Sequence, residues 1–225
     1  MATVLFEDQF EIPFVADLAK FRRWVLSDEF PDRGRIDYIA GCIEVDMSPE
    51  DLFTHGTLKT EVASGIARRV NALDLGHTCI SDTRLSSIPA DLSAEPDIVV
   101  VSYQALDEER VRLIPKATGE EGRFVEVEGA AELIVEIVSD SSVTKDTVRL
   151  PEAYFLAGVR EYWLVDARGE QVFFQIHHRG TDGFAATPHD ANGFQCSEVL
   201  DGDYRLDRHR HQRGHWVYGL KLRCV

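Results

Sequence analysis

The stretch from Ala131 to Asp166 constrains the fold most, because one carboxylate interrupts an otherwise apolar run within it. It reads as an apolar strand containing Glu136, a polar turn, an amphipathic segment and a second apolar strand that ends at Asp166. A charge inside an apolar strand is costly unless a partner neutralises it. Glu136 therefore needs a partner, and a metal ion is one candidate.

Hydrophobic spacing predicts elements in the first third of the chain. A short helix is expected from about Asp17 to Leu26, followed by a β-hairpin around Gly41. A long helix is expected over residues 50–74, because apolar side chains recur every fourth position there. Ser48 is the expected N-cap of this helix, with Pro49 in its first turn.

The remaining two thirds of the chain is predicted to be rich in strands. A helix is expected to start at a cap formed by Asp146 or Thr147 and to end at Gly158, which suits a left-handed C-cap. Residues 103–129 are charged and show little periodicity. The predicted strands are residues 77–88, 97–102, 123–127, 132–138, 159–166 and 171–178.

Composition excludes several classes of protein. No run approaches the roughly 18 apolar residues of a membrane helix, and the N-terminus lacks a signal-peptide pattern, so a soluble cytoplasmic protein without membrane partners is expected. The spacing of the cysteines fits neither a zinc site nor a disulfide framework, and free thiols are expected. The net charge of -15 argues against a general nucleic-acid coat. The four cysteines are Cys42, Cys79, Cys196 and Cys224.

One local basic segment stands out in this acidic chain. Residues 205–215, RLDRHRHQRGH, contain four arginines and three histidines. Three interpretations remain open: a solvated loop, a surface that contacts phosphate groups, and a histidine-rich metal site. The last is the weakest, because the spacings fit no known ligand template.

Two carboxylates are candidates for a shared site. Asp97 begins the apolar run after Pro96, and Glu136 lies near the end of the run at 132–138. If these runs are antiparallel neighbours, about 4.8 Å apart, the two carboxylates meet and a divalent cation would relieve their repulsion. Mg²⁺, or Mn²⁺ in its place, suits such a site and phosphodiester hydrolysis. Taken singly, Asp97 reads as a turn residue.

Without a metal, Glu136 reads as a buried carboxylate that is paired with a cation. The candidate partners are Arg84, Lys145 and Arg149. Tyr154 and Trp163 have the spacing of core aromatic residues.

Several long motifs carry a resemblance to a known family. GCIEVDMSP is followed by His55, and then come EPDIVVVS, LIVEIVSDSS, Asp146 and YFLAGVREYWLVD. Over about residues 35–166 the chain resembles the Uma2-type restriction endonuclease family of the PD-(D/E)xK nuclease superfamily. The resemblance implies that Asp97 and Glu136 are the metal-binding acids, joined by the backbone carbonyl of Ile137, and that His55 is the family's histidine.

The resemblance also implies a fold. It predicts an α/β (α+β) protein with a restriction-endonuclease-like core, in which helices flank a central mixed β-sheet. Residues 1–34 would form an N-terminal helical segment packed on the core, residues 35–180 the core domain, and residues 181–225 a β-rich C-terminal extension.

The chain departs from the family at the catalytic lysine. Val138 stands at the usual position, two residues after the glutamate, and Leu150 stands at the alternative position on the following helix. Lys145 and Arg149, which are four residues apart, are candidate substitutes. The expected function is a Mg²⁺-dependent endonuclease acting on DNA.

Two other functions remain open. The first is a catalytically silent nuclease-fold module that binds nucleic acid or protein. The second is a purely structural dimerisation domain that forms a homodimer, for which the apolar strands VREYWLVD and QVFFQIHH would offer a sheet edge.

Overall fold

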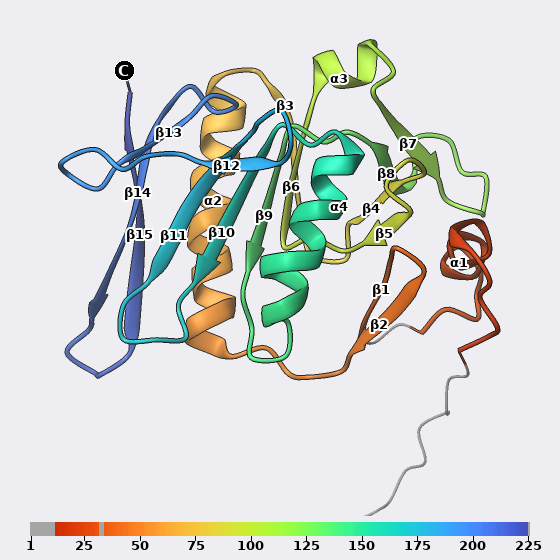
Figure 1. Ribbon diagram of the computed structural model, residues 1–225, viewed down its shortest axis with the longest axis horizontal. Helices are drawn as coiled ribbons and strands as arrows, with labels where there is room; N and C mark the ends of the chain where they lie inside the picture. The colour runs from red at the N-terminus through yellow and green to blue at the C-terminus, as the bar shows by residue number, and fades with distance from the viewer. Residues whose placement is uncertain (1–11, 32–33, 225) are drawn as a thin grey trace, which may run out of the picture.

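The computed structural model describes residues 12–31 and 34–224 (Figure 1). Its helices are α1 (Leu18–Val25), α2 (Thr57–Ala72), α3 (Tyr103–Asp107) and α4 (Leu150–Ala157), with single π-helical turns at Leu52–Gly56 and Lys145–Arg149. Its strands are β1 (Arg35–Ile39), β2 (Cys42–Asp46), β3 (Gly76–Ile80), β4 (Arg84–Ser87), β5 (Leu92–Ala94), β6 (Ile98–Ser102), β7 (Val111–Pro115), β8 (Phe124–Gly129), β9 (Leu133–Ile137), β10 (Glu161–Asp166), β11 (Phe173–Arg179), β12 (Phe184–Ala186), β13 (Gln195–Ser197), β14 (Gly202–Arg210) and β15 (Trp216–Arg223).

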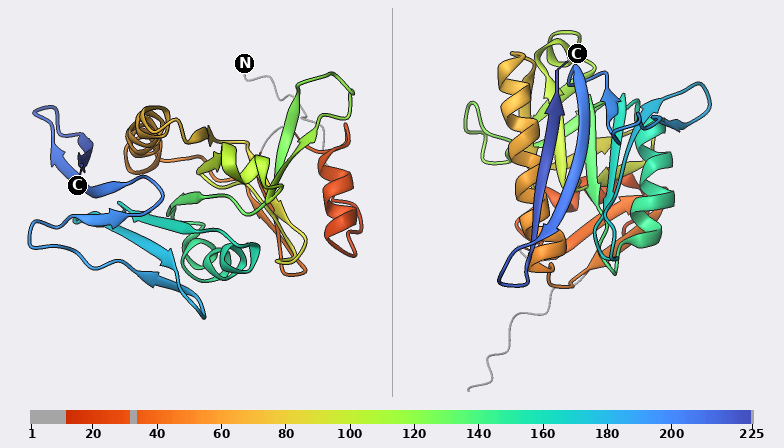
Figure 2. Two further views of the ribbon diagram at one scale, coloured as in Figure 1. Left: turned by 90° about the horizontal axis from the view of Figure 1, so that it is seen from above. Right: turned by 90° about the vertical axis from the view of Figure 1, so that its left-hand side faces the viewer.

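The strands form three sheets. The first has the order β2-β1-β5-β4-β8-β7, the second β12-β11-β10-β9-β6-β3, and the third β13-β14-β15. Helices α2 and α4 cover opposite faces of the second sheet (Figure 2). Side chains alternate accordingly along β6: Ile98 and Val100 pack in the core under α2, whereas Val99 and Val101 pack in the core under α4. This confirms the predicted mixed sheet flanked by helices.

The stretch that contains Glu136 forms the centre of the second sheet. Strand β9 runs antiparallel to β6 and parallel to β10, and α4 connects β9 to β10. Strand β9 is buried along its whole length. A strand buried on both faces reads as a continuous apolar run, which is why a single carboxylate is conspicuous in it.

Several predicted elements are confirmed. The short helix is α1, and the hairpin around Gly41 is formed by β1 and β2. The part of the predicted N-terminal segment at residues 1–11 and 32–33 lies outside the described residues. The four residues spaced along the long helix are all buried in one core: Leu58, Val62, Ile66 and Val70. All four cysteines are free thiols.

The predicted start of the long helix is wrong. Asp51, rather than Ser48, is the N-cap, because its carboxylate accepts hydrogen bonds from the N–H groups two and three residues later. Pro49 therefore lies before the helix. The helical stretch begins with the π-helical turn at Leu52, and α2 ends at Ala72.

The predicted start of the second helix is also wrong. Helical backbone begins at Val143 and Thr144 and continues into the π-helical turn Lys145–Arg149, so Asp146 and Thr147 lie inside the helical stretch instead of capping it. The carboxylate of Asp146 accepts a hydrogen bond from the Ser142 hydroxyl. The predicted end is confirmed: Gly158 has a φ of 91° and forms a left-handed C-cap.

Two predictions in the middle of the chain are corrected. Residues 77–88 form two strands rather than one, because Ser81 and Asp82 adopt positive φ and β3 and β4 enter different sheets. The segment 103–129 contains α3 and β7 in addition to the expected strand, which is β8. Helix α3 has only five residues, too few to show a helical period.

Beyond residue 181 the chain is β-rich, as predicted: β12 extends the second sheet and β13–β15 form the third. The expected dimer edge is wrong, because both apolar strands that would offer it are covered. Strand β10 lies between β9 and β11, and β11 lies between β10 and β12. No helix among the described residues is long and apolar enough to cross a membrane.

Candidate active site

Asp97 and Glu136 occupy matching positions on neighbouring strands. In the antiparallel pair of β6 and β9, Ile98 lies opposite Val135. One residue further along each strand, Asp97 therefore lies opposite Glu136. Both side chains are buried. The predicted antiparallel pairing of the two runs is thus confirmed, although the two carboxylates have different hydrogen-bonding partners.

Asp97 is held by groups from β9, from α2 and from the π-helical turn that precedes α2. Its Oδ2 accepts a hydrogen bond of 2.7 Å from the N–H of Ile137. Lys59 Nζ lies 3.2 Å from Oδ1, and His55 Nε2 lies 3.6 Å from Oδ2. Burial opposes ionisation, but His55 and the positive charges of Arg35 and Lys59 outweigh it and hold the pKa of Asp97 well below its usual range.

Glu136 is held from the other side, by β1 and α4. Its Oε1 accepts a hydrogen bond of 2.5 Å from the Tyr154 hydroxyl, and its Oε2 lies 3.2 Å from a guanidinium nitrogen of Arg35. Burial raises the pKa of Glu136 to about 8, and the nearby carboxylates of Asp146 and Asp97 add to this rise against the charge of Arg35. None of the predicted cation partners bonds Glu136; Arg35 does.

Those predicted partners lie elsewhere. Arg84 pairs with Glu95, and Lys145 Nζ lies 2.9 Å from Asp37 Oδ2. Arg149 is half-exposed and bonds Glu44. Although Lys145 and Arg149 are four residues apart, they therefore face different partners. Lys145 belongs to the group of buried charged side chains around Asp97 and Glu136, which we call the charge cluster. Arg149 lies at the periphery of this cluster.

The two positions that would carry the family's lysine are apolar and buried. Leu150 is fully buried in the core under α4, and Val138 is also buried. Neither side chain can carry charge into the site. The N–H of Ile137 points towards Asp97, and in a β-strand the N–H and C=O of one residue point to the same side. The carbonyl of Ile137 thus faces the strand edge that Asp97 occupies.

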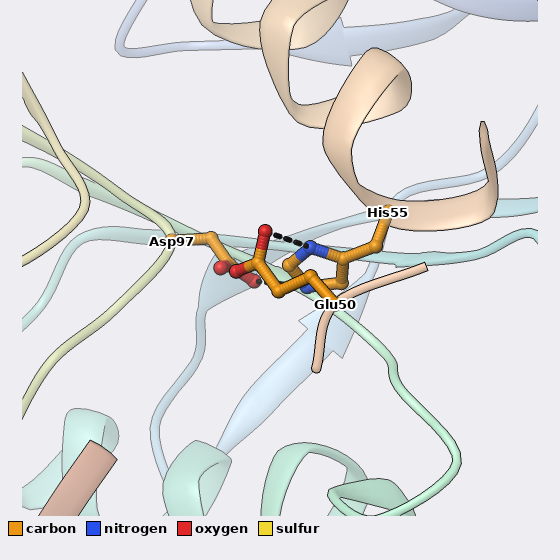
Figure 3. Close-up of side chains that lie close together, drawn as sticks. All are labelled: Glu50, His55 and Asp97. Carbon is orange, nitrogen blue, oxygen red and sulfur yellow. Dashed lines mark ion pairs between the residues drawn. The ribbon is translucent and has the colours of Figure 1, made fainter. Parts of the chain in front are cut away.

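Glu50, His55 and Asp97 bring three potential ligand atoms within 4.8 Å of one another (Figure 3). His55 lies between the two acids, with Nδ1 3.3 Å from Glu50 Oε2. Lys59 bridges the same acids, because its Nζ also donates to Glu50 Oε1 at 2.7 Å. Glu136 is not a member of this group.

Two cavities that share lining residues lie beside this site. A cleft of about 300 Å³ is lined by Asp97, His55 and Lys59 among others. A second cavity of about 430 Å³ is also lined by His55 and extends to Asp140 and Arg168. Asp97 is therefore reachable from outside the protein, through a cleft that carries both carboxylates and cations.

Sequence reasoning missed four members of the cluster: Arg35, Asp37, Glu50 and Lys59. Two signals were present. Arg35 and Asp37 alternate with apolar residues on β1, and Lys59 follows His55 by one helical turn. Glu61 of α2 accepts a hydrogen bond from the N–H of Leu220 in β15 and has a structural role.

The site thus consists of buried acids at one end of a mixed sheet that is flanked by helices. The family model of Uma2, described as "Putative restriction endonuclease", matches residues 18–203. The chain belongs to this family.

A solved structure supports the fold. It is described as a "putative nuclease belonging to DUF820" from Anabaena variabilis ATCC 29413, and it superposes with a TM-score of 0.55 at 18% identity, covering 83% of this chain and 91% of that one. Among curated proteins, none matches the chain.

Replacing Arg35 with methionine tests the charge balance of the cluster. R35M leaves Glu136 and Asp37 without their shared cation, so we expect the free energy of unfolding to fall by about 3–5 kcal/mol in urea titrations. The double variant R35M/E136Q should recover part of this loss, because it also removes the carboxylate that loses its cation, whereas Asp37 keeps its ion pair with Lys145. R23M, at an exposed arginine of α1, is the control and should change stability by about 0.5 kcal/mol or less. Equal stability of R35M and R23M would contradict this account.

Proposed function

We propose that the protein is a Mg²⁺-dependent endonuclease that hydrolyses phosphodiester bonds in DNA, with Mn²⁺ able to replace Mg²⁺. The observation that carries the proposal is the placement of Asp97 and Glu136 at opposed positions of β6 and β9, with a cleft that reaches Asp97. Membership of a family described as restriction endonucleases supports it. The metal ligands would be the carboxylates of Asp97 and Glu136 and the backbone carbonyl of Ile137.

The residues present fit a hard divalent cation. Carboxylate and carbonyl oxygens are the ligands that Mg²⁺ takes in proteins. The cluster is also short of positive charge: the raised pKa of Glu136, about 8, results from burial and from the neighbouring acids Asp146 and Asp97. One oxygen of Asp146, which is itself buried, has no hydrogen-bond partner among the described residues. A bound Mg²⁺ would polarise a phosphoryl oxygen and lower the pKa of a water molecule.

Side chains around the acids would orient the substrate. Arg35 and Lys59 line the cleft and are placed to neutralise a phosphate group that enters it. In this proposal Lys145 takes the role of the lysine that is absent at positions 138 and 150. Its amine, on the π-helical turn after β9, lies among the buried charged side chains, where it contacts Asp37. His55, positioned between Glu50 and Asp97, would orient water or carry a proton at the mouth of the cleft.

A second candidate function is a catalytically silent module that binds nucleic acid or protein. The observation that favours it is that both family positions for lysine are apolar, while Asp97 and Glu136 already contact Lys59, Arg35 and Tyr154. Such a module, if it binds DNA, would do so without cutting it in the presence of Mg²⁺ or of Mn²⁺. Homodimerisation stays a separate prediction, which sedimentation at several protein concentrations can test.

Removing either acid tests the nuclease proposal. The purified protein should nick plasmid DNA in Mg²⁺ or Mn²⁺, and D97A or E136A should abolish the nicking, because each removes a metal-binding oxygen pair. D140A, which removes an exposed carboxylate beside the second cavity, is the matched control and should retain activity. Nicking that survives in both D97A and E136A would exclude this metal site.

Comparing the two candidate cations tests the role of Lys145. K145M should lower the cleavage rate about 100-fold or more, a typical loss for one group that stabilises transition-state charge. R149M should stay close to the parent rate, because Arg149 bonds Glu44 at the periphery. Thermal unfolding of both variants, together with K145R, separates a catalytic loss from a folding defect. Equal rates for K145M and R149M would remove Lys145 from the mechanism.

A further inference from the structure

The end of the β14–β15 hairpin carries a concentrated positive charge that the proposed active site does not use. We call residues 208–216 the basic arm. Its three arginines, Arg208, Arg210 and Arg213, form no ion pair with a carboxylate of the described residues. Arg208 instead donates to the carbonyl oxygens of Ala167 and Gly169, and Arg210 donates to that of Gly214. Carbonyl partners orient a guanidinium without neutralising its charge.

Trp216 contacts two of these arginines at once. The guanidinium carbons of Arg208 and Arg210 lie 4.0 and 4.1 Å from the centre of its ring. Such cation–π contacts hold flexible side chains at a defined spacing, so less conformational entropy is lost when they bind a ligand. A loop that only contacts solvent would not need its arginine side chains to be held in place.

The basic arm is attached to the active-site end of the molecule. The ring of His215 stacks on that of Phe53, with centroids 4.5 Å apart and an angle of 9° between the planes. Phe53 belongs to the same π-helical turn as His55. In Figure 1 the turn between β14 and β15 lies at the lower end of the protein, where α2 begins and β9 ends.

The basic arm lies next to the cavities beside the acids. The cleft over Asp97 and the second cavity share His55 as a lining residue, and Arg168 also lines the second cavity. Arg168 is adjacent in sequence to Ala167, whose carbonyl accepts a hydrogen bond from Arg208. Because Arg168 itself pairs with Asp140 and Asp166, the positive charge without a carboxylate partner among the described residues is that of the basic arm.

We propose that the basic arm is the docking surface for the phosphate backbone of duplex DNA outside the scissile bond. This inference rests on the proposed function for the choice of DNA. A net charge of -15 repels a polyanion, so affinity requires a local positive surface, and guanidinium groups match the bidentate geometry of phosphates. The arm supplies such groups close to the second cavity.

The test compares DNA binding by R210Q/R213Q and the parent protein, in EDTA so that no cleavage occurs. Both arginines are exposed, and Arg208 is left in place because it supports the fold. Fluorescence anisotropy with a short labelled duplex, over a range of salt concentrations, gives the affinity and its salt dependence. The slope of log Kd against log salt should fall by about 1.8, and affinity at about 0.15 M salt should fall about 30-fold.

The matched control is R112Q/R123Q, which removes two exposed arginines from the β7–β8 hairpin, far from the basic arm (Figure 1). Its affinity and salt slope should equal those of the parent. Equal losses in both double variants, an unchanged slope in R210Q/R213Q, or no DNA binding by the parent would each overturn the inference. Binding that depends on the arm in a protein that never cuts DNA would uphold it while refuting the proposed nuclease activity.

Discussion

The structure depends on neutralising charges that are buried at one end of the central sheet. Glu136 lies in a strand with both faces covered, where an uncompensated carboxylate would be costly. Arg35 and Tyr154 reach it from two different elements, and Arg35 also lies close to Asp37. Although burial lowers the pKa of Arg35, these carboxylates raise it well above its ordinary value. These contacts therefore hold β1, β9 and α4 together. The same charged side chains also make the cluster a candidate for catalysis.

The sequence allowed the acids to be predicted but not their partners. Glu136 was visible because a charge in an apolar strand violates the local pattern, and Asp97 followed from the expected pairing of two strands. Arg35 lies 101 residues before Glu136, and neither spacing nor periodicity connects residues that far apart. The same limit applies to the basic arm: its composition was evident, but only the stacking of His215 on Phe53 places it beside the site.

Local hydrogen bonds account for the errors in helix boundaries. Both long helical stretches contain a π-helical turn, and one acid in or beside each turn forms a hydrogen bond that the sequence pattern did not predict. Asp51 caps the first, whereas Asp146 turns inward and accepts from Ser142 in the second. These turns have a functional consequence, because they carry His55 and Lys145 into the charge cluster. The site thus obtains its cations from elements that flank the sheet, while the family positions Val138 and Leu150 contribute only to packing.

The central claim is that Asp97 and Glu136 jointly bind a divalent metal ion. A crystal structure of the protein soaked in Mn²⁺, with anomalous diffraction to identify the ion, tests it most directly. The account predicts one Mn²⁺ ion bound by carboxylate oxygens of Asp97 and Glu136 and by the carbonyl of Ile137, at distances of about 2.1 Å. Lys59 and Arg35 would then withdraw from these oxygens. Anomalous density confined to Glu50 and His55, or none beside Glu136, would contradict the account.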